Sequence, residues 1–138
     1  MDAVVREEFD EAALAPSVGR VAEQLGLQPD WLNNAVGRFT PLDEDESHFT
    51  GAGLYPAEGP PGLRAFLATP RYLLAMKLHA LQNLDRGDRD LRDARQLAAH
   101  LGIRDAAALH GLYLSVYDEA PSDEASLRFR SVLRESPQ

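Results

Sequence analysis

The sequence contains no cysteine, and this absence excludes disulfides, thiolate catalysis and every zinc site built on cysteine. It also has no apolar run near the ~18 residues that a membrane-spanning helix needs. The first residues, MDAVVREEFDE, are too acidic for a secretory signal peptide. With neither signal in the sequence, the cytoplasm is the expected location.

Positive charge is scarce as well. Fourteen lysines and arginines stand against 22 aspartates and glutamates, which gives a net charge of −8. A protein that binds the nucleic-acid backbone by itself needs clustered positive charge, so the composition argues against that class. A small anionic substrate still fits if local positive charge or a metal ion is supplied. Thirteen of the basic residues are arginines, and Lys77 is the only lysine.

Length and composition indicate one ordinary globular domain over residues 1–138, with 44% hydrophobic and 26% charged residues. The predicted fold class is α+β and mostly α, a small sheet fragment packed by a C-terminal helical half. We expect an α/β part at residues 1–68, which includes an irregular loop at 40–62, and a helical part at 69–138.

Turn and capping signals predict the individual elements. Pro16 should end the first helix, and Ser17 should cap the second. Thr69 followed by Pro70 is typical of a helix start. The expected strands are residues 1–5, 49–54 and 63–68, and the expected helices are 7–14, 18–25, 31–36, 71–84, 88–101, 105–117 and 122–133.

Helical periodicity places two charges among apolar residues. Lys77 falls near the centre of a stripe formed by Leu73, Leu74, Leu78, Ala80, Leu81 and Leu84. Asp90 lies within the next stripe and Asp93 at its edge, beside Leu91, Ala94, Leu97, Ala98 and Leu101. Because a short connection joins the two helices, we expect them to pack antiparallel with Lys77 and Asp90 facing the same interior surface.

A lone buried ammonium is costly, so Lys77 needs a partner or a ligand. A structural salt bridge and a ligand-facing pair fit this geometry equally well, and the lysine could also extend its head to water. Asp88 is the natural N-cap of its helix. His79 is expected on the polar, exposed side, and Trp31 in a core or interface.

Three segments resemble the C-terminal half of bacterial nucleotidyltransferase-like proteins: PDWLNNAVGRF, ATPRYLLAMKLHAL and RDLRDARQLAAHLGI. These proteins include the uncharacterised DUF6036 group and the AbiEii-type toxins of type IV toxin–antitoxin systems. The resemblance covers roughly residues 1–103. Its most specific part is the lysine-bearing helix followed by an RD-x-x-D helix, here Arg89 to Asp93.

The resemblance implies Mg²⁺-dependent transfer of a nucleotide from a nucleoside triphosphate to an acceptor. Lys77 would contact phosphate, and Asp90 and Asp93 would orient it or act near the acceptor. A compact ammonium suits a triphosphate, and metal ions would offset the negative field of the chain. The toxin-like relatives make tRNA or a protein a conceivable acceptor and an antitoxin a conceivable partner.

The sequence departs from the family pattern at its start. The family signature has a Gly-Ser segment and a strand with two aspartates. Here MDAVV resembles only the end of that strand, so Asp2 would be the second aspartate and a metal ligand. We therefore expect the chain to be weak or inactive alone, whether as a truncated reading frame, a degenerate descendant or one half completed by another chain.

A second hypothesis is a non-catalytic dimerising or regulatory module derived from the same fold. A missing layer would leave apolar surface on the sheet, and a homodimer would cover it.

Overall fold

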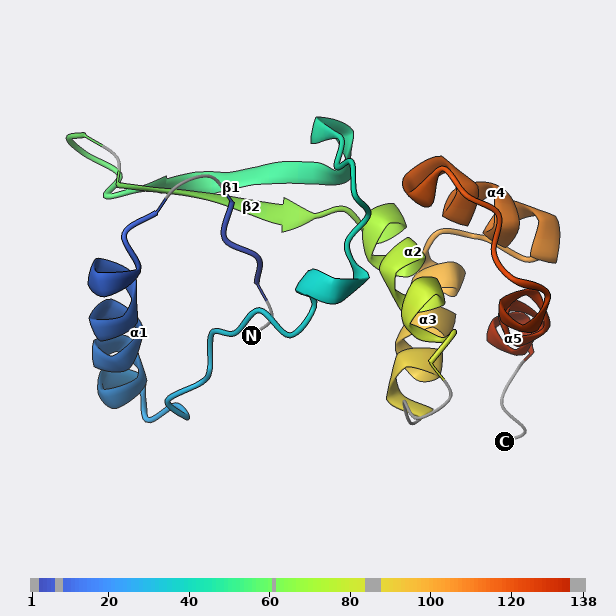
Figure 1. The fold of residues 1–138 in the computed structure, drawn as a ribbon, viewed down its shortest axis with the longest axis horizontal. Helices are drawn as coiled ribbons and strands as arrows, with labels where there is room; N and C mark the ends of the chain where they lie inside the picture. Colours follow the sequence, from blue (N-terminus) through green and yellow to red (C-terminus); the bar gives the residue numbers. More distant parts are fainter. Residues whose placement is uncertain (1–2, 7–8, 61, 84–87, 135–138) are drawn as a thin grey trace. The chain divides into compact units, whose positions relative to one another are not determined.

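The computed structural model describes residues 3–6, 9–60, 62–83 and 88–134. This part of the chain is α+β and mostly helical, with five α-helices and one two-stranded antiparallel sheet (Figure 1). The predicted fold class is confirmed at that level. The chain divides into two compact units, residues 1–40 and 41–138, and each is described by itself. None of the described helices is long and apolar enough to cross a membrane.

The first unit contains one long helix, α1 (Glu11–Leu25), in place of the two short helices expected there. Asp10 caps its start by accepting from the backbone N–H of Ala13, and Gly26 ends it in a left-handed conformation with φ 63°. Pro16 lies inside the helix, so the prediction that it ends a helix is wrong. Proline removes a single helical hydrogen bond, and α1 continues past it. Ser17 is no cap, because its hydroxyl donates to the carbonyl of Ala13 at 3.0 Å.

Two other expectations for this unit are wrong. Residues 31–36 form bends, an isolated bridge at Asn33 and a turn rather than a helix, and the short 3₁₀-helix η1 (Gly37–Phe39) follows them. The predicted strand at residues 1–5 is not formed in its described part, residues 3–5, although the N–H of Ala3 donates to the carbonyl of Asn33 at 2.9 Å. Trp31 donates its indole N–H to the carbonyl of Val18 at 3.0 Å, which holds this segment against α1. Asp2 lies outside the described residues.

The second unit begins with the 3₁₀-helix η2 (Glu46–His48) and a β-hairpin. Strand β1 (Phe49–Tyr55) pairs antiparallel with β2 (Leu63–Ala68), from Phe49 opposite Ala68 to Tyr55 opposite Leu63. The pairing shifts register between Gly51 and Gly53. The bounds predicted for β2 are confirmed, and β1 is one residue longer than expected.

Four helices follow: α2 (Pro70–Ala80), α3 (Asp88–His100), α4 (Ala106–Tyr117) and α5 (Asp123–Leu133). Helix α3 begins at the predicted residue, and the other three begin within one residue of the prediction. Thr69 is the cap that was expected, and Asp105 and Ser122, expected as first helical residues, are caps that accept a backbone N–H. Helix α2 ends at Ala80, before the predicted residue 84, and residue 84 itself lies outside the described residues. Arg128 of α5 donates to the carbonyl of Leu81 at 2.8 Å and so satisfies a backbone group just beyond this end.

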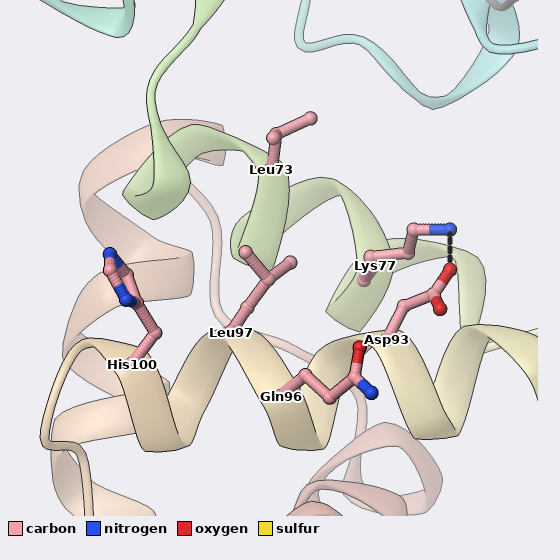
Figure 2. Close-up of a pocket in the computed structure, with 6 residues that line it drawn as sticks. All are labelled: Leu73, Lys77, Asp93, Gln96, Leu97 and His100. Atoms are coloured by element: carbon pink, nitrogen blue, oxygen red, sulfur yellow. Dashed lines mark hydrogen bonds and ion pairs between the residues drawn. The ribbon is translucent and has the colours of Figure 1, made fainter.

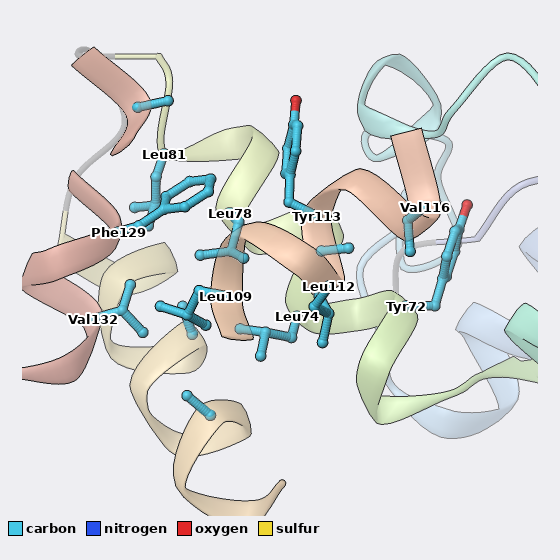
Figure 3. Packing of buried hydrophobic residues seen from close by; sticks show 14 residues of the cluster. Tyr72, Leu74, Leu78, Leu81, Leu109, Leu112, Tyr113, Val116, Phe129 and Val132 are labelled. Carbon is cyan, nitrogen blue, oxygen red and sulfur yellow. The ribbon is translucent and has the colours of Figure 1, made fainter. Parts of the chain in front are cut away.

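The core of the second unit lies among these four helices (Figure 3). Fully buried leucines and aromatic rings from α2, α4 and α5 interdigitate with small alanines of α3, which let the helices approach closely. Burying one such leucine stabilises the fold by about 1.5–3 kcal/mol. The largest fully buried side chains are Tyr72, Leu74, Leu78, Leu109, Tyr113 and Phe129.

Candidate functional site

The ammonium of Lys77 forms two ion pairs with aspartates of the neighbouring helix. Its Nζ lies 2.8 Å from Oδ1 of Asp90 and 2.7 Å from Oδ2 of Asp93, and both are hydrogen bonds. The aspartates are three residues apart, so they project from the same side of α3. The predicted approach of Lys77 to Asp90 is confirmed. What these residues do for function stays a prediction.

Lys77 lies at the edge of the buried face of α2, so its predicted place at the centre of the stripe is wrong. Its side chain is 28% exposed, and Leu73, one turn earlier, is 38% exposed. Leu74 and Leu78 are fully buried instead. The reason is that α2 packs against α4 and α5 as well as α3, which turns the buried face towards Leu78. Lys77 can therefore reach both the aspartates and solvent.

The two aspartates differ in exposure. The side chain of Asp90 is 5% exposed, whereas that of Asp93 is 35% exposed. Asp88 is the first residue of α3, so its expected place as the N-cap, one residue before the helix, is wrong. Asp90 is thus the buried anchor of the lysine, and Asp93 is the carboxylate that solvent or a ligand can reach.

The pKa of Lys77 is raised above its usual value. Burial is the largest single effect and would lower this pKa, but hydrogen bonds and charge attraction from Asp90 and Asp93 together outweigh it. The ammonium is therefore charged at neutral pH. One positive and two negative charges leave the cluster with a net charge of −1 if both aspartates are ionised.

Beside this cluster runs a shallow groove of about 420 Å³ between α2 and α3. Figure 2 shows Lys77 and Asp93 at one end, His100 at the other, and Leu73 and Leu97 between them. Gln96 completes the lining. The groove therefore joins a charged end, an apolar middle and an exposed imidazole.

His79 lies between helices α2 and α4, and its expected place on an exposed polar face is wrong. Its Nδ1 lies 2.8 Å from the hydroxyl of Tyr113, and its ring stacks on Tyr117 with centroids 4.4 Å apart. Gln82 donates to the same hydroxyl at 2.9 Å. Burial lowers the pKa of His79, against a weaker opposing effect of Glu119. Tyr113 and Tyr117, one turn apart, were the signal in the sequence that α4 offers an aromatic face.

The described residues do not fit a Mg²⁺ site on their own. Within them, no group of three or more histidine, aspartate and glutamate side chains could hold a metal ion. Asp90 and Asp93 already bind the ammonium of Lys77, and Asp2, the expected ligand, lies outside the described part of the chain. No chemical step through a metal is therefore assigned to these residues.

Comparison with protein-family models, with characterised proteins and with solved structures finds no match to this chain.

Proposed function

We propose that this chain is a nucleotidyltransferase-like protein whose second unit binds a nucleoside triphosphate, with Lys77 as the residue that contacts phosphate. The observation that carries the proposal is a charged lysine held by two carboxylates at the end of an open groove. The sequence context of the three residues, in which it resembles such transferases, supports the same assignment. A tRNA or protein acceptor and a cytoplasmic location belong to this proposal.

The donors of the ammonium suit this role. An ammonium has three N–H donors, and the hydrogen bonds to Asp90 and Asp93 use two of them. The third can donate to a phosphate oxygen while Asp90 keeps the side chain in place. Fixing a flexible lysine before the ligand arrives lowers the entropy cost of binding. We therefore regard Asp90 as a positioning residue, and Asp93 as either a second positioning residue or a carboxylate near the acceptor.

The charge of the cluster sets a condition on binding. Because three ionised groups sum to −1, free triphosphate is repelled, and the net charge of the chain adds to this repulsion. The proposal therefore requires nucleotide as its Mg²⁺ complex, whose smaller negative charge reduces the repulsion.

A thermal-shift titration of the full chain with Mg²⁺ and each nucleoside triphosphate tests the proposal. Ligand at a hundred times its Kd stabilises the folded state by about 2.7 kcal/mol. We expect nucleotide with Mg²⁺ to raise the melting temperature of the wild type and of Arg92→Ala, an exposed control on the same helix as Asp90 and Asp93. The absence of any shift at millimolar nucleotide contradicts the proposal.

The role of Lys77 requires a variant that removes the lysine together with the nearly buried carboxylate that holds it. Lys77→Ala alone takes a partner from Asp90, so a loss of nucleotide binding in that variant has two explanations, the missing ammonium and local destabilisation. The double variant Lys77→Ala/Asp90→Leu removes the pair together. We expect it to fold and to show no nucleotide shift. A double variant that still responds to nucleotide like the wild type rules out the phosphate role of Lys77.

A second candidate function is a dimerising interaction module. It is favoured by the large apolar side chains that the hairpin exposes on β1 and β2: Leu54, Tyr55, Leu63, Phe66 and Leu67. A second copy of the chain is the proposed partner, since closed two-fold dimers are the commonest assemblies. Sedimentation equilibrium of the wild type and Leu67→Lys tests this. A wild type that stays monomeric up to about 100 μM, far above a micromolar Kd, argues against it.

A further inference from the structure

The groove continues along α3 well past the charged cluster. Asp93, Gln96, Leu97 and His100 follow one another at spacings of three, one and three residues, which puts them on one face of the helix. Leu73 of α2 borders this face. The groove is thus a strip of surface with Lys77 at one end and His100 at the other (Figure 2).

The dimensions of the strip suit one nucleoside with its phosphates. Seven residues of helix separate Asp93 from His100, or about 10 Å along the axis. This is comparable to the distance from a phosphate to the far edge of a nucleobase. The volume of about 420 Å³ falls within the usual range for small-molecule sites.

The chemistry of the strip changes in the same order as that of a nucleotide. Leu73 and Leu97 offer apolar surface to the flat face of a base, and the imidazole of His100 can stack on it. Gln96 lies among them with an exposed amide. One amide offers a donor and an acceptor together, and every nucleobase presents a donor beside an acceptor on one of its edges.

We propose that this groove is a nucleobase subsite. In it the amide of Gln96 hydrogen-bonds an edge of the base, Leu73 and Leu97 contact its face, and His100 stacks on it. The inference rests on the proposed function, because the phosphate role of Lys77 sets which end of the groove holds the base.

Isothermal titration of the full chain with three probes separates the two proposals. The probes are adenosine without phosphates, tripolyphosphate with Mg²⁺, and each nucleoside triphosphate with Mg²⁺. We expect each nucleoside triphosphate to bind more tightly than tripolyphosphate. Gln96→Ala should weaken nucleotide binding about tenfold, the value of one well-formed pair of hydrogen bonds between an amide and a base. It should leave tripolyphosphate unchanged. Gln24→Ala, an exposed glutamine of α1, is the matched control.

The outcomes are distinguishable. Nucleotides that bind no more tightly than tripolyphosphate, with no effect of Gln96→Ala, overturn the subsite and leave the phosphate role of Lys77 standing. Adenosine that binds through Gln96 while tripolyphosphate does not bind supports the subsite and overturns the phosphate role. If no probe binds, both proposals fail.

Discussion

The ammonium of Lys77 lies 2.8 Å from a carboxylate oxygen of Asp90, whose side chain is only 5% exposed. This pair joins α2 to α3 in a place where the aspartate has almost no access to water. Removing one partner leaves the other charge poorly solvated, and this costs more than the pair itself contributes. The predictions for stability begin from this contact.

Lys77→Ala should destabilise the fold by about 2–4 kcal/mol, somewhat below the range for fully buried pairs because the lysine is partly exposed. Asp93→Asn should cost no more than about 1 kcal/mol, since Asp93 is partly solvated. Urea denaturation at pH 7 measures both. The prediction is wrong if the two variants lose equal stability.

Lys77→Ala/Asp90→Leu should recover at least half of the stability that Lys77→Ala loses. The carboxylate is then gone, and an apolar side chain takes its buried position. The same denaturation experiment gives this value. A double variant less stable than Lys77→Ala would show that Asp90 contributes mainly through groups other than Lys77.

Below pH 6.5 the fold should lose stability through His79. Burial lowers the pKa of His79 in the folded protein, so the unfolded chain binds a proton first as the pH falls. Stability therefore decreases from about pH 6.5 down to the lowered folded pKa, below which this contribution is constant. Melting temperatures between pH 7.5 and 5 should fall less steeply in His79→Gln. The prediction is wrong if His79→Gln follows the wild-type curve over this range.

Leu109→Ala should cost about 2–5 kcal/mol, because it leaves a cavity in a fully buried site. Leu127→Ala is the matched control, because Leu127 is 62% exposed, and it should change stability by no more than about 0.5 kcal/mol. Differential scanning calorimetry of both variants gives the comparison. Similar losses of stability in the two variants would show that Leu109 is not part of the core.

Gly53→Ala should destabilise the hairpin by at least about 1 kcal/mol. Gly53 has φ 135°, a conformation that residues with a side chain rarely adopt, and it adjoins the register shift. Gly51→Ala should be nearly neutral, because an added methyl group there meets no atom within 4 Å. Thermal melts compare the two. An unaffected Gly53→Ala would indicate that the backbone can relax at this position.

Most helices and strands of the second unit could be predicted from the sequence. Thr69 caps α2 as expected, and the helices expected from Asp105 and Ser122 begin one residue later, with those two residues as their caps. The approach of Lys77 to Asp90 followed from helical period and a short connection alone. Periodicity could not predict which side of α2 is most deeply buried. That depends on α4 and α5, which come from distant parts of the chain and pack on α2.

Two expectations failed for different reasons. Pro16 is a strong local stop signal, yet α1 continues through it with caps at Asp10 and Gly26. His79 was assigned to a polar face, while its partners Tyr113 and Tyr117 lie more than thirty residues away in sequence. The helix that contains Pro16 is bounded by its own caps, whereas the place of His79 depends on residues distant in sequence.

Because Lys77 is the only lysine, it carries the only ε-amine of the protein. Acylating reagents attack an unprotonated amine, and Asp90 and Asp93 keep this one protonated and hydrogen-bonded. The rate at which this ε-amine is modified, compared with the rate for the α-amine, would therefore report how often the two ion pairs open. The measurement needs no mutation. A ligand that fills the groove should slow this modification.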